Sequence, residues 1–263
     1  RNRYEINEFN TFLAQTIELL FHLYQKGDSD IRNAVCALFD RLTSNLIESH
    51  SNRLLAEYLK GITRASFNKA LRIALKQFAD ICDRIRPNKL RVFTFLLFNS
   101  LPNIIADVND ELLQDSLHQS ITKIFPKLAA YATETEISKL INAYLANFNR
   151  SSSNVRRFSA ISIVILCENS QKPEFYFNYV FNRCLSLIST NEIETKEQYL
   201  VGLNIVLKHS LLKISKYLAK NDLETIDPIL KNLAIYYRHS IATIKHSQNN
   251  ILIGTNLEAL TKC

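Results

Sequence analysis

The sequence has 263 residues, of which 47% are hydrophobic and 22% charged, and this balance is typical of a chain that folds around apolar cores. Glycine occurs only 4 times and proline 5 times, too rarely for the turns that a β-sandwich or barrel needs about every 8–12 residues. The formal net charge of +7 is spread along the chain, which is a weaker sign of a nucleic-acid surface than one basic face. The composition therefore indicates a folding chain and not a disordered one, and it favours long helices with short connections.

The first residue and the cysteines predict that the chain is part of a longer protein and that it lies inside the cell. The sequence begins at Arg1 and contains no methionine, so we expect a fragment of a longer product. No hydrophobic signal segment follows the N-terminus, and the longest apolar uncharged stretch, Val92 to Ala106, is too short and too polar to span a bilayer. The cysteines are odd in number and form no CxxC pair, which predicts reduced, mostly buried thiols in an intracellular protein. They are Cys36, Cys82, Cys167, Cys184 and Cys263.

Apolar residues recur at intervals of three and four over most of the chain, which is the spacing of one face of an α-helix. The clearest case runs from Ser66 to Arg86. Its predicted buried stripe consists of Phe67, Ala70, Leu71, Ala74, Leu75, Phe78, Ile81, Cys82 and Ile85. The charged residues between them should face solvent, and they are Arg72, Lys76, Asp80 and Arg84.

Another amphipathic helix follows Asn109 and Asp110, whose side-chain oxygens can accept free N–H groups of the first turn. Pro126 lies inside this span and predicts a kink, or an end to the regular helix near Phe125, because proline lacks an N–H and crowds the preceding turn. The predicted buried stripe consists of Leu113, Leu117, Ile121, Ile124 and Leu128.

The next helix is predicted after the polar run 151–154. Its body from Phe158 to Cys167 is apolar nearly all round. Several of its residues also favour strands, so a buried strand is the competing interpretation. A helix is favoured because the neighbouring segments are helical and local propensity is a weak guide.

Two helix starts share a pattern in which small polar residues precede a β-branched residue and an arginine. They are residues 28–34 (DSDIRNA) and 152–158 (SSNVRRF). We expect the polar residues to cap the helix and Ile31 or Val155 to turn inward. Arg32 or Arg156 should then bond nearby carbonyls or carboxylates. This arrangement resembles the start of the second helix in HEAT repeats.

Comparable helix starts recur along the chain, and the first four are 36, 44 and 44 residues apart, close to the roughly 40–47 of HEAT or armadillo units. They lie near Asp30, Ser66, Asp110, Asn154, Thr195 and Asn249. First helices are predicted at 5–26, 51–62, 88–106, 134–149, 173–189 and 222–245. The predicted fold is therefore all-α: a right-handed HEAT-repeat α-solenoid of about six helix pairs, whose stacking buries the apolar faces that single pairs expose.

Beyond this pattern, the run from Ile31 to Leu187 resembles the N-terminal HEAT region of the huntingtin family. The tract from Glu136 to Arg157 is the most specific part, and residues 249–260 are similar more loosely. The resemblance is patchy over 1–30 and 190–245, as in a divergent orthologue. Other matching stretches are Ala70–Arg72, Phe78–Asp80, Arg84–Lys89, Phe125–Leu128, Gln171–Lys172 and Phe175–Phe177.

This resemblance implies a large cytoplasmic scaffold, with a nuclear pool as an addition, of which residues 1–263 form the N-terminal HEAT array. It implies roles in vesicle and organelle transport along microtubules and in selective autophagy. The implied partners are the rest of the huntingtin-like chain and a huntingtin-associated protein built of TPR-like repeats. The polyglutamine and proline-rich stretch of vertebrate members does not occur in this chain, so properties tied to that stretch do not transfer.

The motifs of catalysis, cofactor binding and metal binding do not occur. The six histidines form no HExxH motif and no tight Cys/His group, and the four glycines form neither a P-loop nor a GxGxxG motif. There is no GxSxG nucleophile elbow. We therefore expect a non-enzymatic protein-interaction scaffold without cofactor or metal. A nucleic-acid-binding or transport-receptor-type HEAT array is the alternative, favoured by the net charge.

Two groups of residues could contact partners. The basic cluster around Pro87 is either solvated charge near a helix end or a contact for an acidic partner, and it is the candidate partner-contact site. It consists of Arg84, Arg86, Lys89 and Arg91. An aromatic group is expected in the core, with an interface as the alternative. It consists of Phe175, Tyr176, Phe177, Tyr179 and Phe181.

Overall fold

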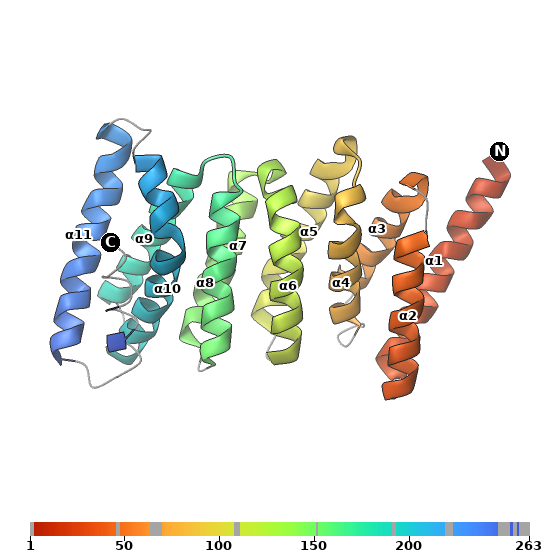
Figure 1. Ribbon diagram of the computed structural model, residues 1–263, viewed down its shortest axis with the longest axis horizontal. Coiled ribbons are helices and arrows are strands. Elements are labelled where there is room, and N and C mark those ends of the chain that lie inside the picture. The colour runs from red at the N-terminus through yellow and green to blue at the C-terminus, as the bar shows by residue number, and fades with distance from the viewer. Residues whose placement is uncertain are drawn as a thin grey trace. The chain divides into compact units, whose positions relative to one another are not determined.

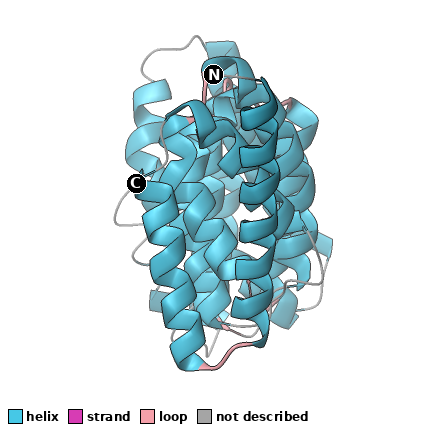
Figure 2. Ribbon diagram, turned by 90° about the vertical axis from the view of Figure 1, so that its right-hand side faces the viewer, coloured by secondary structure: helices cyan, strands magenta, loops and turns pink. Residues whose placement is uncertain are grey.

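The computed structural model describes residues 3–45, 48–63, 70–107, 111–150, 152–190, 193–218, 223–246, 253–254 and 257. All regular structure within these ranges is helical, with no strand (Figure 2). The predicted all-α class is therefore confirmed. The strand alternative for residues 158–167 is wrong, because that segment lies inside a helix that is packed between helical neighbours.

The helices alternate between the two members of successive pairs. The first members are α1 (Arg3–Lys26), α3 (Glu48–Thr63), α5 (Pro87–Asp107), α7 (Glu134–Ala146), α9 (Pro173–Thr190) and α11 (Leu223–His246). The second members are α2 (Ser29–Asn45), α4 (Leu71–Ile81), α6 (Glu111–Leu128), α8 (Ser153–Glu168) and α10 (Ile193–Leu218). Short 3₁₀ turns follow three helices: η2 (Cys82–Arg84), η3 (Ala129–Tyr131) and η4 (Asn147–Asn149). The predicted starts at Ser66, Asn109–Asp110 and Asn249 lie outside the described residues.

The chain divides into two compact units. Unit 1 comprises Arg1–Ile104 and Val108–Glu136, and unit 2 comprises Ile105–Asp107 and Ile137–Cys263. In unit 1, α4 contacts both α2 and α6, and these helices form the layer in front of α1, α3 and α5 (Figure 1). In unit 2, α10 contacts α8 and α9, and α11 contacts α9. Within each unit, the helix pairs thus pack on one another, as repeat proteins do. The hand of the superhelix stays a prediction.

The predicted stripe of α4 is the core of unit 1. All of its described members are buried: Ala70, Leu71, Ala74, Leu75, Phe78, Ile81, Cys82 and Ile85. The charged positions between them are exposed, as predicted. Apolar side chains at this spacing lose contact with water only when α3 and α6 cover them, so the stripe stabilises the stacking of neighbouring pairs.

The two similar helix starts are capped as predicted, but they differ in their β-branched residue. The Ile31 amide donates to Asp28 Oδ1 over 2.9 Å, and the Val155 amide donates to Ser152 Oγ over 3.5 Å. Val155 is buried, whereas Ile31 is 41% exposed, so the prediction that Ile31 turns inward is wrong. Ile31 instead lies against Gly27 in the turn that precedes α2.

Pro126 does not end the regular part of α6, which runs on to Leu128 before η3 begins. The predicted end near Phe125 is therefore wrong by about one turn. Pro126 deprives only the Thr122 carbonyl of its helical partner, and both residues are exposed, so water can replace that bond.

Candidate partner-contact surface

Arg84 connects the 3₁₀ turn after α4 to the C-terminal end of α2. It lies in η2, and its Nη1 donates to the Thr43 carbonyl in the last turn of α2 over 2.8 Å. A carbonyl there has no helical partner, so a cation both satisfies it and complements the helix dipole. Arg84 therefore helps to hold α4 against α2, and its donors are partly used inside unit 1.

Arg91 is held by a buried carboxylate. Its two terminal nitrogens donate to the Glu136 oxygens over 2.9 and 3.0 Å, and the Glu136 side chain is only 5% exposed. Burial raises the Glu136 pKa, but the hydrogen bonds from Arg91 and Thr133 outweigh it, so the pKa lies below its ordinary value. Arg91 also donates to the Tyr131 carbonyl over 3.3 Å, and its guanidinium lies 5.6 Å from the centre of the Phe95 ring.

Arg86 and Lys89 keep their charges free. Both residues are exposed, and their side chains form no hydrogen bond or ion pair with the part of the chain that the structure describes. Only their backbone amides are engaged: Arg86 N donates to Asn52 Oδ1 over 3.5 Å, and Lys89 N donates to the Arg86 carbonyl over 2.9 Å. The basic cluster is therefore divided into two structural arginines and two free cations. Its role as a partner contact stays a prediction.

Apolar side chains lie exposed on α5 beside this cluster, and sequence analysis missed them. Val92 and Phe95 are each 50% exposed, Leu96 is 42% exposed, and Tyr131 in η3 is 43% exposed. The spacing of three and four places Val92, Phe95 and Leu96 on one face of α5. Because α5 is apolar on its packed face as well, periodicity could not distinguish its two faces.

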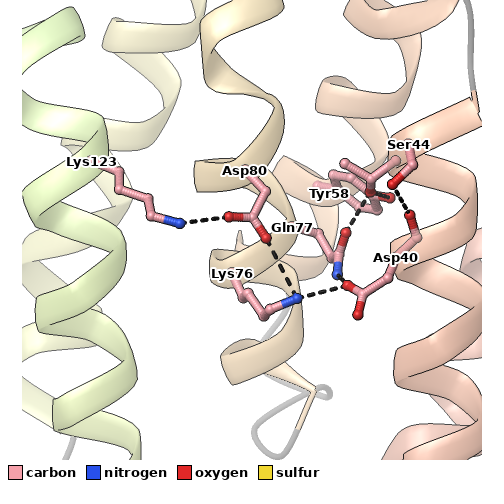
Figure 3. Close-up of polar contacts among 8 residues, drawn as sticks. Asp40, Ser44, Tyr58, Lys76, Gln77, Asp80 and Lys123 are labelled. Atoms are coloured by element: carbon pink, nitrogen blue, oxygen red, sulfur yellow. Dashed lines mark hydrogen bonds and ion pairs between the residues drawn. The ribbon is translucent and has the colours of Figure 1, made fainter.

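A ladder of polar contacts crosses the second helices of unit 1 (Figure 3). Asp40 of α2 accepts from Lys76 of α4 over 2.6 Å, and Lys76 lies 3.4 Å from Asp80. Asp80 in turn accepts from Lys123 of α6 over 2.7 Å. The hydrogen bond from Lys76 is the main reason why the Asp40 pKa is lowered. The ladder alternates in sign and links three successive second helices of unit 1.

Beneath the ladder lies a buried polar group that joins α2, α3 and α4. The Gln77 amide donates to Asp40 Oδ1 over 2.7 Å and accepts from the Thr43 hydroxyl. The Thr43 and Tyr58 hydroxyls share a hydrogen bond of 2.9 Å. Each of these buried groups has a partner, so the set is a structural contact and not a ligand site.

The metal-ligating and nucleophilic side chains of the described ranges bear on whether the fold holds a chemical site. No group of three His, Cys, Asp or Glu residues within the described ranges is placed to hold a metal ion. The described cysteines are free thiols, and burial raises the pKa of Cys82 to about 11 and of Cys184 to about 12. Both are therefore neutral and weakly nucleophilic at neutral pH. Among the helices as described, none is both long and apolar enough to cross a bilayer.

The aromatic group of α9 lies mainly in the core, which confirms the favoured interpretation for three of its members. Tyr176, Phe177 and Phe181 are buried in unit 2, whereas Phe175 is 49% exposed. Tyr179 is half-buried, and its hydroxyl donates to Asn142 Oδ1 of α7 over 3.0 Å. This group therefore joins α9 to its neighbours.

Within each compact unit, helix pairs pack on one another, and this arrangement defines the chain as an all-helical repeat protein of the HEAT type. The family model described as "Huntingtin, N-terminal HEAT 1" matches residues 20–172. The chain therefore belongs to the huntingtin family, and the resemblance in its sequence is confirmed.

Two relatives show how far the chain has diverged. Huntingtin of Takifugu rubripes is 28% identical over 204 residues, which cover 77% of this chain and 6% of that protein. The HD protein homolog of Dictyostelium discoideum is 34% identical over 119 residues, 43% of this chain and 4% of that protein. The chain thus spans only a small part of its relatives' length. Two engineered proteins of known structure are similar with TM-scores of 0.46 and 0.42, at 11% and 10% identity. They cover 94% of this chain, and the matches span 96% and 97% of the engineered chains.

Proposed function

We propose that this chain is a non-catalytic, protein-binding segment of a huntingtin-like scaffold, with residues 1–263 forming the N-terminal HEAT array of a much larger protein. The observation that supports this most is the match of the huntingtin HEAT model to residues 20–172, in a chain whose helix pairs pack on one another within each compact unit. In such an array the function is geometric. Neighbouring pairs hold outward-facing side chains at fixed spacing and so present an extended binding surface.

Polar bridges between pairs support this mechanism. The ladder from Asp40 to Lys123 and the Arg91–Glu136 ion pair join residues that are 36 to 45 positions apart. Each bridge therefore connects one repeat to the next. Such contacts limit sliding of the helices, and a surface that keeps its shape binds with less loss of conformational entropy.

The cellular role we propose is support of vesicle and organelle transport and of autophagy, through assembly of several partners in the cytoplasm. Membership of the huntingtin family is the support for this role. The partners proposed are the remainder of the huntingtin-like chain and a huntingtin-associated protein built of TPR-like repeats.

The test is crosslinking mass spectrometry on the full-length protein, assembled with that TPR-like partner. We expect crosslinks from exposed lysines of this segment, such as Lys139 and Lys172, to the partner or to later parts of the chain. A full-length variant that lacks residues 1–263 is the comparison. Absence of such crosslinks, together with an unchanged set of partners after the deletion, would contradict the proposal.

A further inference from the structure

We propose that α5 carries a docking surface for an acidic amphipathic helix of a partner protein. This inference rests on the proposed scaffold function and names the surface and the chemistry of its partner. The α5 surface has an apolar centre formed by Val92, Phe95, Leu96 and Tyr131. Its basic rim is formed by Arg86 and Lys89.

The apolar centre is exposed although α5 is not the first or last helix of unit 1. Its four side chains are each 42 to 50% exposed. Large apolar residues that gather on a protein surface commonly mark a binding site. Val92, Phe95 and Leu96 are spaced three and four residues apart on α5, so they form a short stripe along the helix. A partner helix with apolar residues at the same intervals would cover such a stripe.

The aromatic anchor of this surface is held in place before any partner arrives. Arg91 lies over the Phe95 ring, with 5.6 Å between the guanidinium carbon and the ring centre. Arg91 is itself fixed by two hydrogen bonds to the buried Glu136 carboxylate. An anchor whose rotamer is already restricted loses little entropy on binding, and aromatic anchors carry much of the affinity at interfaces.

The charge around the centre selects the partner. Glu136 neutralises Arg91, so the positive charge left at the rim belongs to Arg86 and Lys89. Arg86 directly precedes α5, which begins at Pro87, and Lys89 lies in its first turn, so the positive end of the helix dipole adds to their potential. A partner helix bordered by Asp or Glu complements this rim and would be steered to it.

A membrane surface is the less favoured occupant. Recognition of anionic lipids usually needs about 4–8 neighbouring basic residues, each contributing about 1 kcal/mol. The α5 surface has two free cations, which is below that range. A single acidic helix, in contrast, needs only one or two charge contacts beside its apolar stripe.

The experiment selects peptides from a phage-displayed library of amphipathic helices against the full 263-residue chain. Counter-selection uses a variant with Arg86→Glu, Lys89→Glu and Phe95→Ser. We expect the recovered peptides to carry an aliphatic stripe bordered by Asp or Glu. Their dissociation constants, measured by fluorescence anisotropy, should rise about tenfold or more for Phe95→Ser alone and for Arg86→Glu/Lys89→Glu alone.

A matched control carries the same change of charge elsewhere in unit 1. Lys26→Glu/Arg41→Glu replaces two exposed cations on α1 and α2, and it should bind the peptides as the wild type does. Because all substituted side chains are exposed, the melting temperature by circular dichroism should stay at the wild-type value. Leu96→Gln gives a second, milder test of the apolar centre.

Three results would overturn the inference. The recovered peptides could lack acidic residues, or they could bind the α5 variants as tightly as the wild type. Alternatively, Phe95→Ser could abolish binding to phosphatidylserine vesicles, or self-association, instead of peptide binding. The crosslinks in the full-length assembly distinguish the two proposals. If they persist in the Phe95→Ser variant, the proposed scaffold function is retained and the α5 surface is rejected.

Discussion

Glu136 is an ionised carboxylate with little exposure, and its partners decide its contribution to stability. Arg91 and Thr133 hydrogen-bond to it and lower its pKa below the ordinary value of 4.5, although burial acts in the opposite direction. A lowered folded-state pKa means that the ionised form stabilises the fold. That contribution is present above pH 4.5 and is lost as the pH falls through the folded value.

We predict that Glu136→Gln destabilises the protein by about 1–2 kcal/mol at neutral pH, since a charge-assisted pair is lost while the half-exposed Arg91 can still reach water. The difference in melting temperature from the wild type should shrink as the pH falls below 4.5. Thermal unfolding followed by circular dichroism across pH measures it. Asp115→Asn, at an exposed position of α6, is the control. A difference that stays constant with pH would contradict the assignment.

Gly202 and Gly61 permit close approach of two aromatic rings. A Cβ on Gly202 would overlap the ring of Phe148, which is fully buried in η4. A Cβ on Gly61 would meet the buried ring of Phe21 in the same way, at 2.5 Å. Neither ring can leave its site without opening the core, so we expect both glycines to be required.

We predict that Gly202→Ala destabilises the fold by about 1–3 kcal/mol through overpacking, although alanine is favoured over glycine in a helix by about 1 kcal/mol. Gly254→Ala is the matched control, because among the described residues, apart from its chain neighbours and its own helical backbone, no atom lies within 4 Å of the position that a Cβ would take, and it should be neutral or slightly stabilising. Urea unfolding compares the two. Equal free energies of unfolding for both variants would show that the Phe148 contact is not tight.

At the scale of the element, burial and surface charge contribute unequally to the packing of α6. Its inner face carries Leu117, which is 6% exposed. Its outer face carries Lys123, which is 60% exposed in its ion pair with Asp80. Exposed ion pairs contribute at most about 1 kcal/mol, whereas an unpaired charge in a core costs several. The stripe, and not the ladder, should therefore determine whether α6 stays packed.

We predict that Leu117→Asp destabilises unit 1 by roughly 3 kcal/mol or more, because it places an unpaired carboxylate among apolar side chains. Lys123→Glu should cost about 1 kcal/mol. Gln119→Asp, at an exposed position of the same helix, should change the free energy of unfolding little. Hydrogen exchange should show the loss of protection in α5 and α6 first. Wild-type stability of the Leu117→Asp variant would disprove the assignment of the stripe.

At the scale of the whole molecule, the net charge of +7 is the reason for considering nucleic acid as a ligand. In the structure several of these cations are paired: Lys76 with Asp40, Lys123 with Asp80 and Lys127 with Asp83. Paired cations release fewer counterions from a phosphate backbone, so their contribution to affinity falls.

We therefore predict that DNA and RNA are not retained in a filter-binding titration at low salt. Lys76→Gln/Lys123→Gln should change nothing in this assay. Retention that falls steeply with added salt is the signature of phosphate contacts, and it would favour the nucleic-acid-binding array over the protein scaffold.

The periodic spacing of apolar residues predicted the helices and the buried stripe from Ala70 to Ile85, because a helix places every third or fourth residue on one side whatever surrounds it. The same local reasoning failed at Ile31 and Pro126. Ile31 lies exposed beside Gly27, and Thr122, whose carbonyl loses its helical partner at Pro126, is also exposed, so α6 continues to Leu128. The candidate site was located only in part: the basic cluster was recognised, but its apolar neighbours on α5 were not.

What the sequence determined by itself is the helical class, the register of the pairs and the family. The helical class and the register of the pairs depend on the spacing of apolar residues within one or two helical turns. The family depends on the order of residues along the sequence. What only the tertiary structure decided is which charges are free. Arg84 meets Thr43 and Arg91 meets Glu136 across more than 40 positions of the chain. Only packing shows which side of a helix that is apolar nearly all round meets water, and so where a partner can bind.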